Sequence, residues 1–238
     1  MNRTAFTLSA IVVAILLSYA LHQALDVAPT EASMGNVQRI FYYHVSSFLA
    51  AFVMFGVNLL ASVFYLLRRH TSAALAADAV AMSAAELGVI FCSVGLMAGM
   101  LWAKPVWGIW WTWDPRLTST FVLWLIYVSY LMLRRLSEGD QAPTLAAALA
   151  IFGFVDVPIV YMSIRWWRTQ HPQPVIFGER GQSGLDPAML TALLVNIAAF
   201  LCYGALVFWV RYKLERARQA LREAQAIRSL ELARMEAR

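Results

Sequence analysis

The chain has 238 residues, of which 61% are hydrophobic and 14% are charged, with a formal net charge of +5. Soluble globular domains carry about 25% charged residues, so this composition excludes an ordinary soluble domain. It is typical of an integral membrane protein.

Six apolar blocks follow one another along the chain. They cover residues 5–22, 41–67, 79–101, 117–133, 144–164 and 187–210. A membrane crossing takes about 20 helical residues, and a sheet edge exposed to lipid would leave backbone groups unsatisfied. We therefore expect an all-α protein with six transmembrane helices in one domain, residues 1–210. A helical basic tail is expected over 211–238. The first block has the flanks of a signal peptide, but its length predicts that it is retained.

The basic residues predict the orientation of these spans. With both termini in the cytoplasm, thirteen Lys and Arg residues lie inside and six lie outside. Basic loops stay preferentially on the cytoplasmic side, so this orientation is favoured. Without the tail the tally is five against six, which leaves an unusually basic outer face. Its bases near the tryptophans indicate a negatively charged ligand: Lys104, Arg116, Arg165 and Arg168.

The segment WGIWWTWDPRLTST joins the third and fourth blocks. Four of its residues follow helical spacing and would share one face: Trp107, Trp110, Trp111 and Asp114. Pro105 offers a helix start and Pro115 offers a helix end. We therefore predict a short amphipathic Trp-rich helix on the outer membrane surface.

Asp114 and the tryptophans of this segment have separate expected uses. Asp114 is expected to cap the fourth span, with Pro115 at its first helical position. Each tryptophan alone would suit the aromatic belt of a membrane interface. Because Trp113 and its neighbours are crowded into one loop, the cluster instead favours a platform for a planar aromatic ligand.

Three of the four histidines lie on the predicted outer side: His22, His44 and His171. A lone interfacial histidine is more often a polar anchor than a ligand. Heme, however, needs a flat apolar floor, axial imidazole nitrogens and cations for its propionates. Histidines, tryptophans and bases on one face therefore indicate a heme site.

Three segments carry a resemblance to a known family: VQRIFYYHVSS, LWAKPVWGIWWTWDPRLTS and VDVPIVYMSIRWWRTQHP. The second is similar to the tryptophan-rich WWD motif of heme-handling proteins. Over all six spans, the chain resembles the heme exporter protein C family, also called cytochrome c maturation protein C (CcmC). Pro115 and Asp156 depart from the family pattern, in which alanine and asparagine are more usual, but neither is a ligand position.

The resemblance implies a bacterial inner-membrane protein that holds heme b on its periplasmic side. It implies delivery to the periplasmic heme chaperone (CcmE-type) during c-type cytochrome biogenesis. The implied partners are the ATPase and membrane subunits of an ABC transporter (CcmA- and CcmB-type) and a small single-span subunit (CcmD-type).

The resemblance also implies residue roles. By motif, His44 and His171 are the axial ligands of the heme iron. The motif residues of the platform are Trp107, Trp110, Trp111, Trp113 and Asp114. The propionate partners are expected among Arg116, Lys104, Arg165 and Arg168.

Two other functions compete with heme handling. A secondary transporter would use acids inside the membrane, for which Glu86 and Asp156 are the candidates. A b-type cytochrome would carry histidines in the middles of facing spans, and these blocks contain none there. No nucleophile and base pair or phosphate-binding glycine loop stands out, so we expect no enzymatic activity.

Overall fold

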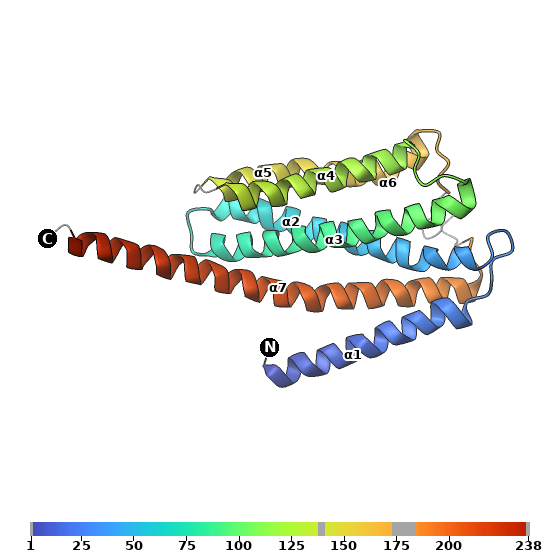
Figure 1. Ribbon diagram of the computed structural model, residues 1–238, viewed down its shortest axis with the longest axis horizontal. Helices are drawn as coiled ribbons and strands as arrows, with labels where there is room; N and C mark the ends of the chain where they lie inside the picture. Colours follow the sequence, from blue (N-terminus) through green and yellow to red (C-terminus); the bar gives the residue numbers. More distant parts are fainter. Residues whose placement is uncertain (1, 138–140, 173–183, 237–238) are drawn as a thin grey trace.

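The computed structural model describes residues 2–137, 141–172 and 184–236. Its α-helices, in chain order, are α1 (Arg3–His22), α2 (Ile40–Arg68), α3 (Ala73–Trp107), α4 (Pro115–Leu136), α5 (Ala142–Phe154), α6 (Asp156–Trp166) and α7 (Pro187–Glu236). A short π-helix, η1 (Gln23–Val27), continues α1, and a 3-10 turn, η2 (Asn36–Arg39), leads into α2. The helices lie side by side along one long axis (Figure 1).

Six helical stretches in the described residues are long and apolar enough to cross a membrane, which confirms the predicted spans. Each predicted block lies within one of them, and α5 with α6 makes the fifth. The tail is helical as expected, because α7 continues through it to Glu236 and extends beyond the other helices (Figure 1). The all-α fold class is therefore confirmed.

The fifth span is interrupted between α5 and α6. Pro158 lies in the first turn of α6 and has no N–H to donate to the carbonyl of Phe154. The N–H of Val155 instead bonds to the carbonyl of Phe152 at 3.2 Å, one residue short of the helical pattern. The proline therefore accounts for the break.

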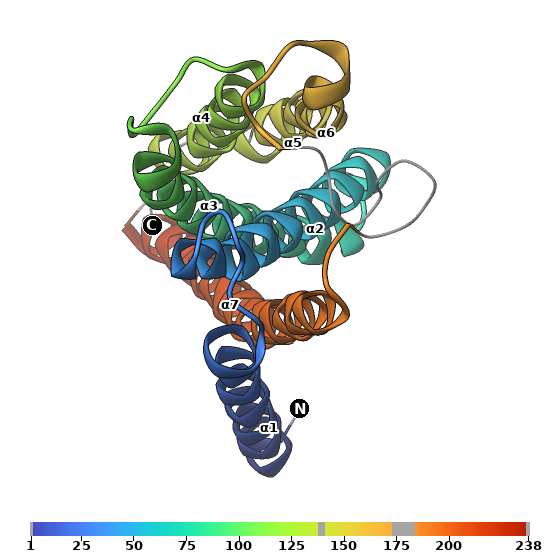
Figure 2. The ribbon, with the colours of Figure 1, turned by 90° about the vertical axis from the view of Figure 1, so that its right-hand side faces the viewer.

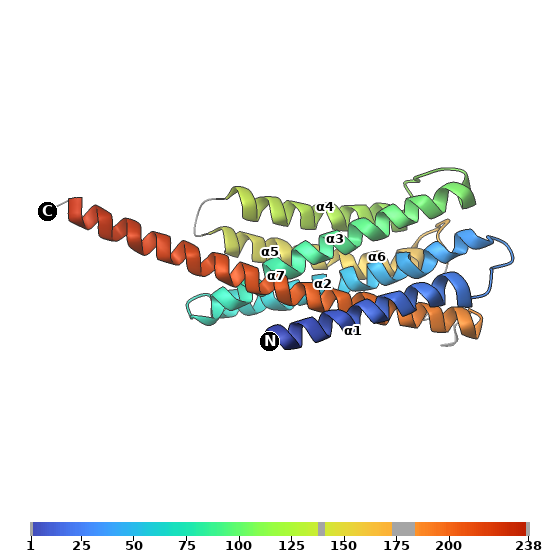
Figure 3. The ribbon, with the colours of Figure 1, turned by 60° about the horizontal axis from the view of Figure 1, so that its bottom comes forward.

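The antiparallel helices α2 and α3 form the centre of the bundle. As Figure 2 shows, α4, α5 and α6 lie on one side of this pair, and α7 lies on the other. Buried aromatic rings pack between the layers, including Phe55 stacked on Tyr127 at 3.8 Å between ring centroids. Helix α1 is outermost and lies along α7 (Figure 3).

The two ends of the bundle differ. One end, called here the Trp-loop end, carries the loop 108–114, the beginning of α2 and the end of α6 (Figure 1). The opposite end, called here the tail end, carries the beginning of α1 and the far part of α7. Both ends of the chain therefore point the same way, as an even number of spans requires.

Partly buried ion pairs tie α7 and α4 to α3 toward the tail end. Arg211 of α7 bonds to Glu86 of α3 and, at 3.1 Å, to Glu215. Asp78 of α3 pairs with Arg134 of α4 at 2.8 Å. Partly buried charges inside a membrane bundle need partners, so Glu86 has a structural use that requires no transported ion.

Candidate functional site

Two histidines that are remote in sequence meet at the Trp-loop end. His44 lies on the second turn of α2, and His171 lies in the segment that follows α6. Their ring centroids are 6.4 Å apart, and the ring planes are inclined by 29°. The third histidine that was predicted to face outward, His22, instead pairs with Asp26 at 2.9 Å and is well exposed.

Both meeting rings use the same nitrogen for a backbone hydrogen bond. Nδ1 of His44 lies 3.0 Å from the carbonyl oxygen of Gly95 in α3. Nδ1 of His171 lies 3.0 Å from the carbonyl oxygen of Pro172. A carbonyl oxygen only accepts, so each Nδ1 carries the proton and donates it. The lone pair of each neutral ring is therefore on Nε2, the arrangement usual for metal-binding histidines.

The surroundings of His171 favour its neutral form. Burial lowers the pKa of His171 below its usual value, and the positive charge of Arg116 lowers it further. The N–H of His171 donates to the hydroxyl of Thr169 at 3.0 Å, which orients the backbone of this segment. Neutral imidazole is the form that ligates a metal.

Aromatic rings enclose His44. Phe48, one helical turn further along α2, packs edge-on at 4.9 Å between centroids, and Trp102 of α3 lies at 5.8 Å. Neither residue was in the predicted site. Trp102 belongs to the tryptophan cluster in the sequence, and helical spacing from His44 would have identified Phe48.

The predicted Trp-rich surface helix is not formed, and this expectation was wrong. Helix α3 continues through Pro105 to Trp107, and residues 108–114 are irregular. Gly108 ends α3 with a φ of 78°, a left-handed conformation that glycine adopts without a steric cost. Its N–H still bonds to the carbonyl of Lys104 at 3.0 Å. The remaining residues before Pro115 are too few for an independent helix.

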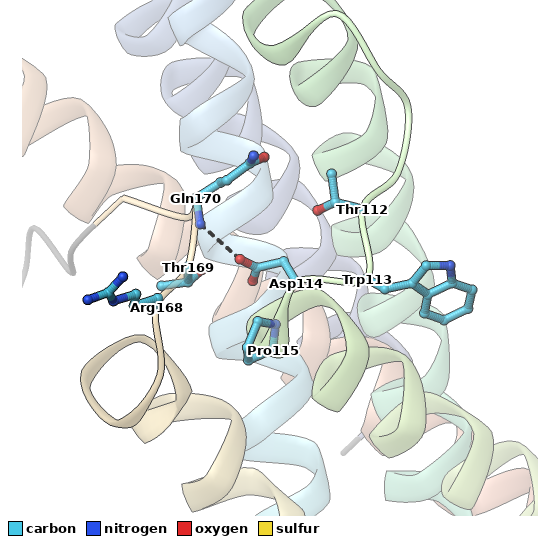
Figure 4. A pocket seen from close by; sticks show the side chains of 7 residues that line it. All are labelled: Thr112, Trp113, Asp114, Pro115, Arg168, Thr169 and Gln170. Carbon is cyan, nitrogen blue, oxygen red and sulfur yellow. Dashed lines mark hydrogen bonds between the residues drawn. The ribbon is translucent and has the colours of Figure 1, made fainter.

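As a result, the tryptophans of the loop do not share one helical face. Trp107 belongs to the last turn of α3, and Trp110 is 54% exposed beside the amine of Lys104. Trp111 packs edge-on against Trp113 and Phe121. The ring of Trp113 points away from the other residues of the pocket (Figure 4) and is 74% exposed.

Asp114 is buried and connects two loops. Its Oδ1 accepts the N–H of Arg116 at 2.9 Å, which confirms the predicted cap of α4. Its Oδ2 accepts the N–H of Gln170 at 2.9 Å, as the dashed line in Figure 4 shows. The Trp loop is thereby joined to the segment that carries His171. This second bond was not predicted, because it joins residues far apart in sequence.

Arg116 is engaged by the backbone of α6. Its Nη1 donates to the carbonyl of Val160 at 2.6 Å and to that of Tyr161 at 3.3 Å. These bonds join the start of α4 to α6, the second helix of the interrupted fifth span. Arg116 therefore helps to position the two helices that precede and follow the candidate site.

The other three predicted bases lie nearer the surface. The amine of Lys104 donates to the carbonyl of Gly108 at 2.9 Å. The guanidinium of Arg165 lies over the Tyr161 ring, 5.4 Å from its centroid. Arg168 lines an open pocket of about 480 Å³ between residues 112–115 and 168–170 (Figure 4). Of these bases, Arg168 is the one in the pocket beside the Asp114 tether.

Six membrane-length helices, a histidine pair and a Trp-Asp loop at one end define a polytopic membrane protein with a candidate ligand site near its surface. A family model described as heme exporter protein C matches residues 1–227. The chain therefore belongs to the heme exporter protein C family.

Individual relatives agree with this assignment. The chain is 33% identical to heme exporter protein C of Bradyrhizobium diazoefficiens, over 92% of this chain and 81% of that protein. It is 33% identical to heme exporter protein C of Escherichia coli K12, over 78% of this chain and 73% of that protein. A putative cytochrome c biosynthesis ccmC-like mitochondrial protein of Arabidopsis thaliana is 32% identical, over 84% of this chain and 73% of its own length.

Proposed function

We propose that this chain binds heme b at the Trp-loop end and delivers it to a heme chaperone during c-type cytochrome biogenesis. His44 and His171 are the axial ligands of the iron in this proposal. The names of the relatives, which refer to heme export and cytochrome c biosynthesis, support the choice of heme as cargo. The chain's role is to hold and hand over this cargo.

The meeting of the two histidines is the observation that carries the proposal. Imidazole nitrogens bind transition metals at about 2 Å, so two rings on opposite sides of one iron have centroids roughly 6 Å apart. The separation of 6.4 Å between His44 and His171 fits that requirement. The shared Nδ1–H to carbonyl bonds fit it as well, because they leave Nε2 as the ligating nitrogen.

We assign contact with the rim of the macrocycle to the Trp loop and the neighbouring bases. The motif residues proposed as its platform are Trp107, Trp110, Trp111, Trp113 and Asp114. Among the four bases we favour Arg168 as a propionate partner, because it lines the open pocket and lies three residues from His171. Arg116 is better explained by its bonds to α6.

The proposed setting is the bacterial inner membrane, with the Trp-loop end in the periplasm. Residues 1–210 form the heme-handling domain, and residues 211–238 form a cytoplasmic basic tail. The excess of basic residues on the side that carries both termini, thirteen against six, supports this orientation. The proposed partners are a CcmE-type chaperone, CcmA- and CcmB-type transporter subunits and a CcmD-type single-span subunit.

An absorption spectrum of the purified protein tests this function. We expect a six-coordinate, low-spin heme in the parent. His44→Ala and His171→Ala should each lose heme or become five-coordinate, and added imidazole should partly restore the low-spin form. His22→Ala is the matched control, because His22 is an outer histidine paired with Asp26. A low-spin spectrum that survives loss of His44 or His171, but not of His22, would refute the ligand assignment.

A further inference from the structure

Helix α3 presents three glycines to three rings of α2. Gly99, Gly95 and Gly88 face His44, Phe48 and Phe55, respectively. The steps along both helices are four and seven residues, so each set lies on one helix face. Small residues at such contacts let membrane helices approach closely.

At the Trp-loop end, this contact surrounds the imidazole of His44. A Cβ atom on Gly99 would lie 3.0 Å from Cε1 and 3.3 Å from Nδ1 of His44. Cε1 joins the two ring nitrogens, so a methyl group there would press on the edge that contains both. One turn earlier, Gly95 supplies the carbonyl that accepts the Nδ1 proton at 3.0 Å.

The ring has little room to yield. Phe48 packs edge-on against it, and Trp102 contacts it from α3. The two helices are also closely packed one turn away, where a Cβ on Gly95 would lie 2.8 Å from the Phe48 ring. A methyl group at position 99 must therefore displace the imidazole or disturb its bond to Gly95.

We propose that Gly99 is a positioning residue for the iron ligand His44. Its lack of a side chain lets the imidazole rest against α3, where the Gly95 carbonyl holds Nδ1–H and Nε2 remains for the metal. The inference rests on the proposed heme ligation by His44. Gly99 itself touches neither the metal nor the macrocycle in this role.

Gly99→Ala tests the role by heme titration and absorption spectroscopy. Disturbing the hydrogen-bond partner of a metal-ligating histidine typically weakens metal binding by about 10- to 100-fold. We expect that loss here, with a five-coordinate fraction that added imidazole returns to low spin. Gly204→Ala is the matched control, since its Cβ would lie 3.2 Å from Phe91 at a helix contact outside the site. It should keep the parental spectrum and affinity.

A measurement without heme isolates the positioning effect. Ring ¹⁵N shifts of the heme-free protein report which nitrogen of His44 carries the proton, with His44→Ala identifying the signal. The parent should show the Nδ1–H form, and Gly99→Ala should lose that single form. An unchanged ring signal together with unchanged heme affinity would overturn the proposal. If the parent itself lacks low-spin heme, the proposed function fails, while the ring signal still decides the role of Gly99.

A double variant covers the case in which Gly99→Ala does not accumulate in the membrane. Removing the imidazole in His44→Ala/Gly99→Ala makes room for the new methyl group. Accumulation of the double variant alone would support crowding between these two residues. If His44→Ala alone accumulates but neither variant with Gly99→Ala does, the methyl group clashes elsewhere, which would overturn the proposal.

Discussion

Replacing Asp114 with asparagine separates its two structural roles. An asparagine side chain keeps one carbonyl oxygen, so it can still cap α4 by accepting the N–H of Arg116. Its amide group is a donor and cannot accept the N–H of Gln170, which Oδ2 of Asp114 accepts at 2.9 Å. Asp114→Asn therefore retains the cap and removes the tether to the His171 segment.

The size of the expected effect follows from the hydrogen bond that Asp114→Asn removes. A hydrogen bond to a charged group contributes about 1.5–3 kcal/mol, and each 1.4 kcal/mol is a factor of about ten. Amide hydrogen exchange at Gln170 should accelerate roughly 10- to 100-fold in Asp114→Asn. Heme retention should fall by a similar factor, because His171 follows Gln170 directly. Asp114→Ala should lose about 1 kcal/mol more, the usual value of a cap.

Asp186→Asn provides a control with the same local geometry. Asp186 also precedes a proline that begins a helix, and its Oδ1 accepts the N–H of Ala188 at 2.8 Å. Asparagine caps as well as aspartate, so this variant should behave like the parent. The tether would be refuted if Asp114→Asn left both Gln170 exchange and heme retention at parental values.

Three further predictions concern proton competition, orientation and the two arginines. Because burial lowers the pKa of His171, heme should stay bound as pH falls through about 6.5 and dissociate only below it, in a spectroscopic pH titration; loss already above pH 6.5 would contradict this. A reporter active only in the periplasm should stay inactive when fused after Arg238, and activity there would reverse the proposed orientation. Arg116→Lys should lower the free energy of unfolding by about 1–3 kcal/mol, because its bonds to carbonyl groups are lost. Arg168→Gln should instead weaken heme retention and leave the free energy of unfolding unchanged. Equal heme retention in Arg168→Gln and the parent would remove Arg168 as a propionate partner.

Features governed by nearby residues could be predicted from the sequence. Apolar run length predicted the six spans, since backbone hydrogen bonding in lipid leaves few alternatives to a helix. The Asp114-Pro115 pair predicted the start of α4, because a cap depends on residues next to each other. The prediction of a Trp-rich helix was wrong for a local reason as well. Helix α3 tolerates Pro105 near its exposed end and is ended by Gly108.

Contacts between distant segments could not be predicted in this way. The histidine pair was expected from family resemblance, but the bond of His44 to Gly95 depends on how α2 and α3 pack. The tether from Asp114 to Gln170 depends on where α6 ends. Glu86 was a candidate transport acid until the fold placed Arg211 beside it. Helical spacing contains no information about such partners.

The protein holds the two proposed ligands differently, and this difference predicts which one leaves the iron first. His44 lies on α2, bonds to the backbone of α3 and is enclosed by aromatic rings, whereas His171 lies in a loop joined to the Trp loop through Gln170. A ligand on packed helices is preorganised, but a loop ligand can move away when cargo is handed over. Carbon monoxide added to the ferrous protein should therefore replace His171 and leave His44 bound opposite. The vibrational spectrum of the carbonyl complex should then match between the parent and His171→Ala and differ in His44→Ala. A parental spectrum that matched His44→Ala instead would show that the helical ligand is the one that leaves.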